Sequence, residues 1–372
     1  MSAGAALDRR PAVPIERIGV SVYTIPTPEP ESDGTAEWSS TTMLLVELEA
    51  GGERGTGWSY GSPATAEIVR EHFAPLVRGA DVHAVRELWT RLAGVMRNPG
   101  RNGMASYALG AVDVAMWDLR ARILGIPLCD LIGRVRDRVP VYGSGGFTSL
   151  DLGALHEQCR AWSAAGMRMV KIKVGRDHAS DVDRVRVARE AIGPRCALMI
   201  DANGGYDAAG AIGFAHRIAA YDVCWFEQPV DPRDHDGMRR VRAALPPGMA
   251  LSSGEYITDT ADAAAVAGAV DVLQADATRC GGYTGLLAID GFCEVRRLPL
   301  STHCAPALHV HAALGCLQLR HIEWFVDHVR IESELFDGFP KPHDGTVAPD
   351  RSRPGHGLTF RRDRAARYAV EE

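Results

Sequence analysis

The sequence has no paired cysteines. Its eight cysteines stand singly along 372 residues, and no Cys-x-x-Cys spacing occurs. Zinc clusters and disulfide frameworks need closer or patterned cysteines, so both kinds of cross-linked protein are excluded. We expect reduced and mostly buried thiols, as is typical of a cytoplasmic protein.

Long apolar stretches are missing as well. The chain has no uncharged apolar run of about 18 residues, and residues 1–19 lack the apolar core of a signal peptide. We therefore do not expect a membrane-spanning or secreted protein. The expectation is a soluble, cytoplasmic one.

An excess of positive charge is also absent. The formal net charge is −6, and the lysines and arginines are scattered among the acids. A mildly acidic surface repels nucleic acid and anionic lipid, so we expect neither as a partner. An anionic small molecule would have to be attracted locally by Lys, Arg or a metal ion.

What is present is an ordinary globular composition, 46% hydrophobic and 24% charged, in a chain long enough for a barrel and a companion domain. Residues 1–137 are predicted to form an α+β domain. Its expected strands, 16–24 and 42–49, flank a polar stretch, Pro26–Thr41, that is either a flexible connection or a lid. Helical periodicity then covers Ala64–Leu76, Val82–Met96 and Met104–Leu124.

From residue 139 the pattern becomes a regular alternation of short apolar strands and Ala-rich helices. The expected strands are 139–146, 170–175, 197–203, 224–229, 250–255, 272–278, 300–304 and 321–325. Eight parallel strands separated by helices predict an α/β fold, a (β/α)8 barrel over residues 138–336, with its chemistry at the C-terminal ends of the strands. Residues 337–372 include a strand-like segment at 357–360, and we expect this tail to return to the N-terminal domain.

Ionisable side chains recur at the ends of these strands. Successive members are 28, 26, 28, 21, 27 and 20 residues apart, and each interval fits one strand–helix module. The set is Lys173, Asp201, Glu227, Glu255, Asp276, His303 and Glu323. Any one of them could be an unrelated polar strand end, but the shared register predicts that all seven face one mouth.

Three successive members are carboxylates, Asp201, Glu227 and Glu255. Such a group is costly to hold together without a cation, because like charges at short range force one acid to protonate. Oxygen ligands without Cys or His favour a hard ion, and Mg²⁺ is the cofactor that we expect. The alternative is three unrelated polar strand ends.

Lys171 and Lys173 are two residues apart in an expected strand and therefore share a face. If that face is the barrel interior, desolvation and mutual repulsion depress the pKa of both, and a neutral lysine base becomes available. If the pair faces outward, the lysines are solvated, and Val170, Ile172 and Val174 fill the interior.

His303 stands one module after Asp276, so this carboxylate can orient the imidazole and raise its basicity. A structural histidine is the alternative, and we interpret His309 and His311 in the following helix as structural.

Two further groups stand near these residues. Glu323 could donate a proton to a substrate carboxylate if acidic neighbours keep it neutral, or it could be a surface salt-bridge partner. Arg279, just past Asp276, could orient that carboxylate or pair with an anionic substrate.

These parts suit removal of a proton next to a carboxylate. That proton is weakly acidic, and a divalent ion stabilises the charge that develops as the proton leaves. Two bases on different strands allow two outcomes. Return of the proton by the second base inverts the centre, whereas protonation of a departing β-hydroxyl dehydrates the substrate.

The motifs resemble the enolase superfamily and, within it, the mandelate racemase subgroup, over nearly the whole chain. Those in the barrel are VKIKVG, IDANGGY, WFEQP, SSGE, QADATRCGG, STH and IEWF. Those outside the strand ends are ALGAVDVAMWDLRARILGIP, DLIGR, VPVYGSGG and PGHGL. The resemblance implies an enolase-like modified barrel with an N-terminal capping domain.

It also implies a role for each strand-end residue. Lys173 would be one general base, tuned by Lys171. Asp201, Glu227 and Glu255 would bind Mg²⁺. Asp276 and His303 would form the second acid/base pair, and Glu323 would hydrogen-bond the reacting carboxylate.

Two segments resemble the loops with which the capping domain closes over a substrate, Pro26–Thr41 and 56–64. We predict substrate contacts from Arg279, Tyr60 and Ser144. Most resembling members dehydrate acid sugars, so we expect an aldonate or aldarate to become a 2-keto-3-deoxy acid. A racemase or epimerase of a 2-hydroxy acid is the alternative, and a barrel that binds a metal and an anion without turnover is a third. Barrels of this type usually associate, so we expect a homo-oligomer.

Overall fold

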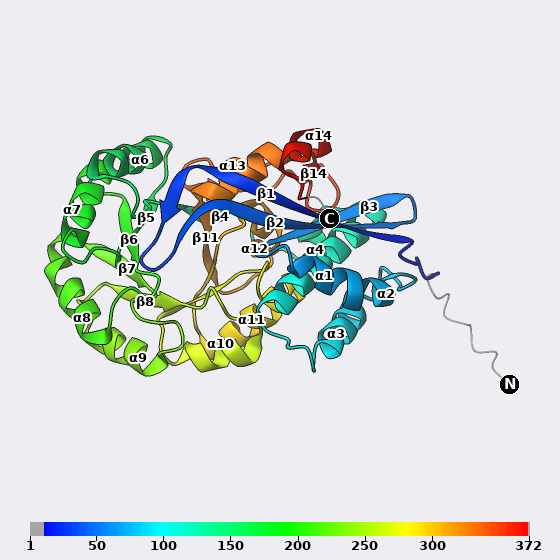
Figure 1. The fold of residues 1–372 in the computed structure, drawn as a ribbon, viewed down its shortest axis with the longest axis horizontal. Helices are drawn as coiled ribbons and strands as arrows, with labels where there is room; N and C mark the ends of the chain where they lie inside the picture. The colour runs from blue at the N-terminus through cyan, green and yellow to red at the C-terminus, as the bar shows by residue number, and fades with distance from the viewer. Residues whose placement is uncertain (1–10, 371–372) are drawn as a thin grey trace.

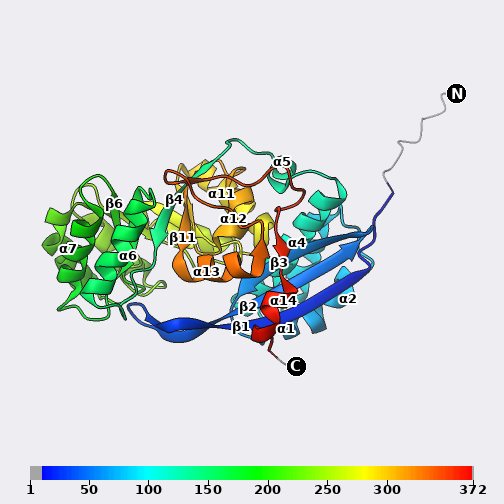
Figure 2. The same ribbon diagram turned by 90° about the horizontal axis from the view of Figure 1, so that it is seen from above.

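The computed structural model describes residues 11–370, so the part of the signal-peptide expectation that concerns residues 1–10 lies outside the described residues. Within the described range, no helix combines the length and the apolar character needed to cross a membrane. Figures 1 and 2 show two bodies side by side, a barrel surrounded by helices and a smaller unit of sheet and helices.

The smaller unit contains a three-stranded antiparallel sheet. Its strands are β1 (Arg17–Ser32), β2 (Glu37–Ala50) and β3 (Glu53–Tyr60), in that order across the sheet. The loop expected at 26–41 is wrong, because strand structure runs through it and only residues 33–36 turn. The prolines of this segment are tolerated because β1 is an edge strand, and the pairing register shifts between Pro26 and Glu31.

Helices follow this sheet in the chain. They are α1 (Thr65–Ile68), the π-helical turn η1 (Val69–Phe73), α2 (Ala74–Val77), α3 (Val85–Val95), α4 (Met104–Ile123) and α5 (Leu128–Ile132). Among them, α4 packs on β2 and β3. The sequence predicts a loop at 56–64, but β3 runs through residue 60 and packs directly against α4. Glycine permits this contact, since a Cβ on Gly55 would stand 2.4 Å from the backbone oxygen of Ala115.

The predicted (β/α)8-type barrel is confirmed. Its strands are β4 (Val139–Ser144), β5 (Met169–Lys173), β6 (Ala197–Asp201), β7 (Val223–Glu227), β8 (Ala250–Ser253), β9 (Val272–Ala275), β10 (Leu300–Thr302) and β11 (Leu319–Phe325). Neighbours pair in parallel in chain order, and β11 closes the barrel on β4. The helices are α6 (Leu152–Ala164), α7 (Asp181–Ile192), α8 (Ala208–Arg217), α9 (His235–Ala244), α10 (Thr260–Ala267), α11 (Gly282–Arg296), α12 (Pro306–Ala313) and α13 (Val326–Leu335).

The C-terminal segment touches both bodies. Strand β13 (Thr346–Val347) pairs with the start of β4, while β12 (Phe336–Asp337) pairs with β14 (Thr359–Phe360). Helix α14 (Arg362–Ala365) follows, and Arg362 forms an ion pair with Glu47 of β2. A β-bridge joins Ala369 to Tyr23 of β1.

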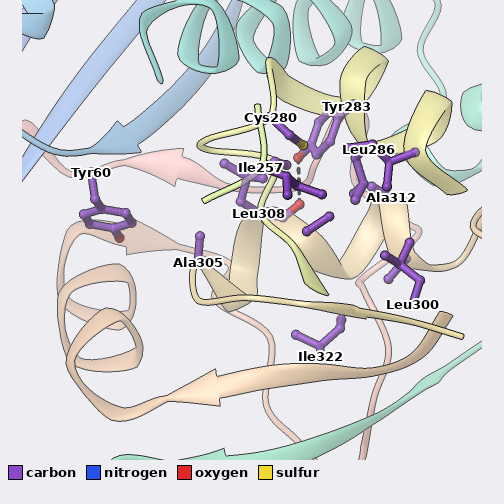
Figure 3. Close-up of a cluster of buried hydrophobic side chains, with 14 of the residues drawn as sticks. Tyr60, Ile257, Cys280, Tyr283, Leu286, Leu300, Ala305, Leu308, Ala312 and Ile322 are labelled. Atoms are coloured by element: carbon purple, nitrogen blue, oxygen red, sulfur yellow. Dashed lines mark hydrogen bonds between the residues drawn. The ribbon is translucent and has the colours of Figure 1, made fainter. Parts of the chain in front are cut away.

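Apolar side chains fix the barrel helices against the strands. Figure 3 shows one such cluster, in which side chains of α11 and α12 meet those of β10 and β11. The Tyr283 hydroxyl, which is buried there, donates to the backbone oxygen of Leu308 at 2.7 Å and so joins α11 to α12. Such packing holds the strand ends, and the polar groups on them, in fixed positions.

Candidate active site

The polar site lies at the C-terminal ends of the barrel strands. Figures 1 and 2 show the β1–β2 hairpin reaching from the smaller unit across this end of the barrel. The strand alternation of β5 turns Lys171 and Lys173 into the interior, where they are 0% and 5% exposed. Val170 and Ile172 belong to the apolar core, so the structure shows the inward arrangement of the lysine pair.

Each lysine lies against carboxylates. The Lys173 Nζ is 2.5 Å from the Asp201 Oδ2, and the Lys171 Nζ is 2.7 Å from the Glu227 Oε2 and 2.8 Å from the Glu323 Oε1. The predicted depression of the lysine pKa values is wrong for this arrangement. Burial lowers the pKa of Lys171, but the Glu227 and Glu323 carboxylates outweigh it and hold that pKa well above its usual value.

The same balance applies to Lys173. Burial lowers the pKa of Lys173, and the positive charge of Lys171 lowers it further. The attraction of the Asp201 carboxylate outweighs both, so the pKa is raised above its usual value. Both lysines are therefore ammonium ions when their carboxylate partners are free to bind them.

His303 lies between two carboxylates. Its Nδ1 is 2.9 Å from the Asp276 Oδ2, and its Nε2 is 2.6 Å from the Glu255 Oε2. Burial lowers the pKa of the imidazole, but Cys304, Glu255 and Asp276 raise it well above its usual value. The pKa of Asp276 is lowered to about 2, because its bond to His303 outweighs the effect of burial.

Glu323 is ionised rather than neutral. Its Oε1 accepts from the Ser144 hydroxyl at 2.6 Å, and its Oε2 accepts from the Cys304 backbone N–H at 2.7 Å. Burial raises its pKa, but Lys171 and His303 lower it well below its usual value. The prediction that acidic neighbours keep Glu323 neutral is therefore wrong for this arrangement, because the Lys171 ammonium group lies beside its carboxylate.

The carboxylate set fits a hard cation. Buried oxygens of Glu227 and Glu255, Oε1 in each, have no hydrogen-bond partner, although each residue's other oxygen is bonded. Unpaired buried oxygens of this kind need a cation or a proton. In the described part of the chain, one group of His, Cys and carboxylate side chains has its possible ligand atoms within 4.8 Å of one another, namely His303, Cys304 and Glu323. Lysines stand between other carboxylates, as Lys171 does between Asp201 and Glu227.

A cavity of about 330 Å³ opens above these groups. Its floor includes Lys173, Glu255 and His303, while Trp38 and Thr41 of the hairpin contribute to its roof. The sequence-predicted residues Arg279 and Tyr60 also line it. Ser144 does not, because it lies behind Glu323.

The lining residues that sequence reasoning missed include Cys304, Asp327 and His328. The Cys304 Sγ is 3.3 Å from the His303 Nε2, and the His328 Nδ1 accepts from the Ala305 backbone N–H at 3.0 Å. Their positions just after the ends of β10 and β11 were the available signal.

The loops that begin at the strand ends are conformationally unusual. Four non-glycine residues there, Asn203, Gln228, Cys304 and Ala305, have φ values of 46°, 41°, 49° and 39°. Such backbone persists only where the surroundings enforce it, and it clusters at functional sites.

A second, larger cavity of about 740 Å³ shares Asn203 and Tyr256 with the first and is lined by none of the seven predicted strand-end residues. Volume alone therefore does not mark the reactive end, and the titratable side chains do.

This architecture, a capped barrel with acids and bases at its strand ends, is that of enolase-like enzymes. Residues 18–133 match the mandelate racemase/muconate lactonizing enzyme N-terminal domain, and residues 154–364 match the enolase C-terminal domain-like family. The chain belongs to the mandelate racemase/muconate lactonizing enzyme family of the enolase superfamily.

Named relatives are similar over their full length. The 3,6-anhydro-α-L-galactonate cycloisomerase of Streptomyces coelicolor is 32% identical, covering 96% of this chain and 99% of that protein. A mandelate racemase/muconate lactonizing enzyme-like protein from Rubrobacter xylanophilus is 47% identical with a TM-score of 0.95, covering 96% of this chain and 100% of that one. The Salmonella typhimurium L-talarate/galactarate dehydratase, solved with Mg and L-lyxarohydroxamate, is 27% identical with a TM-score of 0.90, covering 100% and 96%.

Proposed function

We propose that this protein removes the proton next to the carboxylate of an acid sugar, with Mg²⁺ as its cofactor. The reaction that we propose is dehydration to a 2-keto-3-deoxy acid. The observation that carries the proposal is the convergence of two bases, Lys173 and His303, on one buried cavity beside paired carboxylates. The names of the relatives, which include a dehydratase of acid sugars and a cycloisomerase, support the substrate class.

Asp201, Glu227 and Glu255 would hold the metal. When bound there, Mg²⁺ supplies positive charge beside the substrate carboxylate as the proton leaves. If Asp201 bound the metal, Lys173 would lose the partner that keeps it charged. Burial and the neighbouring Lys171 would then favour the neutral amine, which is the form that can accept a proton.

The two bases approach the cavity from different strands. Lys173 ends β5 and His303 follows β10, with β4 and β11 between them on the shorter path around the barrel. In dehydration, Lys173 takes the α proton and His303 donates a proton to the departing hydroxyl. Asp276 positions the imidazole through Nδ1, so that Nε2 faces the reaction.

Glu323 has a supporting role in this proposal. It fixes Lys171 on one side and the backbone N–H of Cys304 on the other. Approach of an anionic substrate carboxylate raises the pKa of Glu323, and the acid can then take up a proton and donate it in a hydrogen bond.

Racemisation or epimerisation is the second candidate function. It needs the same two bases, one to remove the α proton and the other to deliver a proton to the opposite face of the same carbon. The observation that supports it is the placement of Lys173 and His303 on different strands around one cavity.

The test is incubation of the protein with Mg²⁺ and a set of aldonic and aldaric acids in deuterated water. We expect a 2-keto-3-deoxy acid that carries solvent deuterium at C3, where the enol left by dehydration is protonated, and we expect this product to disappear with a chelator. Deuterium at the α carbon of the recovered acid without keto acid, together with an inverted product, would select the racemase. Absence of both keto acid and α exchange with every acid would overturn the proposed function.

A further inference from the structure

The cavity has two ends, and they differ in the charged side chains that line them. The reacting end, at the strand ends, contains Lys173, His303 and Arg279. The other part of the cavity wall comes from the hairpin and from the first turn of α13, which contributes Asp327 and His328, and we call this part the distal end. A substrate whose carboxylate lies at the reacting end extends its other end towards these groups.

The permanent cations of the cavity are already paired. Among the described residues that line it, these are Lys173 and Arg279. Lys173 binds Asp201 at 2.5 Å, and Arg279 lies 3.9 Å from the Glu255 Oε2 and 3.8 Å from the Asp276 Oδ2. Both pairs belong to the reacting end.

The distal end has a negative group instead. Asp327 is buried and accepts from the Thr41 hydroxyl at 2.5 Å and from the Arg330 guanidinium at 2.5 Å. Arg330 is not among the lining residues, so its charge reaches the cavity only through Asp327. Asp33 of the hairpin turn is a second lining carboxylate.

The neighbouring histidine does not supply a cation. The His328 Nδ1 accepts a backbone N–H from Ala305, and the ring stacks on Tyr60 with centroids 3.7 Å apart. An imidazole that accepts at Nδ1 carries no proton there and is neutral. Burial agrees with this, since it lowers the pKa of His328 to about 4.

Hydroxyl groups make up much of the remaining distal wall. Ser40, Thr41 and Thr42 line the cavity from β2. Hydroxyls donate and accept, so they suit the hydroxyls of a sugar chain. A second carboxylate would meet Asp327 and Asp33, and no described lining residue offers it an unpaired permanent cation. Like charges brought together in this way oppose binding.

Resting on the proposed function, we propose that the substrate is an acid sugar with a single carboxylate, an aldonate-type or anhydro-aldonate acid, and that the distal end of the cavity excludes diacids. Neither choice follows from the family, since the names of the relatives include a galactonate derivative and the diacid galactarate. Asp327 is the residue that sets this specificity.

The test compares each aldonate with the aldarate of the same carbon chain and configuration, with Mg²⁺ and at constant ionic strength. Deuterium entry, at C3 of the 2-keto acid or at the α carbon of the recovered acid, reports the chemistry, and the ratio of kcat/KM values reports the selectivity. We expect the aldonate to be preferred by about tenfold or more. In Asp327→Asn, which leaves the Arg330 charge uncompensated, this ratio should move towards the diacid.

Asp344→Asn is the matched control, because it removes the same charge from a carboxylate that is 70% exposed in the loop before β13. Its ratio should equal that of the wild type. An aldarate that is used as well as its aldonate by the wild-type protein would overturn the inference and leave the proposed function standing. Absence of exchange with either class would overturn both. The wild-type ratio needs no variant, so a poorly folding Asp327→Asn does not remove the test.

Discussion

Three carboxylates at the strand ends each pair with a basic side chain. Asp201 pairs with Lys173, Glu227 with Lys171, and Glu255 with His303. Ion pairs at this depth last only while each partner stays in place, because a single buried charge is very costly. Under the proposed metal assignment, binding of a divalent cation to these carboxylates would therefore also change the protonation of the bases.

This exchange predicts a metal-dependent stability. Mg²⁺ at about 100 times its Kd should stabilise the folded protein by about 2.7 kcal/mol, which raises Tm by several degrees. Glu227→Gln removes one ligand oxygen and should abolish most of the rise. Differential scanning fluorimetry with and without Mg²⁺ measures it, with each variant as its own reference.

Glu190→Gln is the control, since that carboxylate is 57% exposed on α7. It should keep the full Mg²⁺-dependent rise. An undiminished rise in Glu227→Gln would show that Glu227 is not a ligand.

At the residue scale, the sequence predicts positions better than charge states. The two-residue spacing of Lys171 and Lys173 suffices to place both side chains on one face of a strand, and the structure shows that this face is the barrel interior. The direction of their pKa shifts depends on Asp201, Glu227 and Glu323, which arrive from other strands at distances that spacing does not determine.

The β1–β2 hairpin is the element that covers the site. The Ser32 hydroxyl lies 2.7 Å from that of Thr148, and the Thr35 hydroxyl donates to the Asn203 backbone oxygen at 3.0 Å. Polar residues and prolines in this segment favour a loop, which is why a loop was expected there. Pairing with β2 and docking on the barrel override this local preference and form strands.

A half-buried acid on this hairpin, Glu31, predicts a pH dependence. The Glu31 carboxyl accepts from the Trp38 indole N–H at 2.9 Å, and burial, with Asp327, raises its pKa from 4.5 to about 7. The docked hairpin therefore favours the protonated acid. This contribution is fully present below pH 4.5 and is lost as the pH rises to about 7.

We expect the KM for substrate to rise over that pH interval and to depend less on pH in Glu31→Gln, which stays neutral. Steady-state kinetics from pH 4.5 to 8 measure the difference. Glu29→Gln, an exposed position of the same strand, should retain the wild-type profile. Identical profiles for Glu31→Gln and the wild type would contradict a role of Glu31 in docking.

The whole molecule couples the capping unit to the barrel through a buried carboxyl. Glu332 of α13 accepts from the Trp58 indole and the Tyr60 hydroxyl of β3, both at 3.1 Å, and from the Ala307 backbone at 2.9 Å. Tyr60 therefore reaches the cavity with its ring, while its hydroxyl is bound to Glu332. The hairpin and the strand ends are thus held on one framework.

For the whole molecule, the sequence predicted the barrel but not the short strands that connect it to the smaller unit. Eight apolar strands with polar ends at module spacing define the parallel barrel, because each strand needs a crossover helix of similar length. Strand β3 was not predicted because its glycines reduce strand propensity. One of them, Gly55, is the residue that allows α4 to approach the strand. The pairing of β12 with β14 involves two-residue strands that leave almost no sequence pattern.

The most direct measurement is α-proton exchange in Lys173→Ala and His303→Asn, with Mg²⁺ and both α-epimers of a monocarboxylic acid sugar, read by NMR in deuterated water. Two opposed bases in one cavity predict that each variant loses exchange for one epimer and keeps it for the other. Full exchange of both epimers by both variants would contradict the assignment of these residues as the bases.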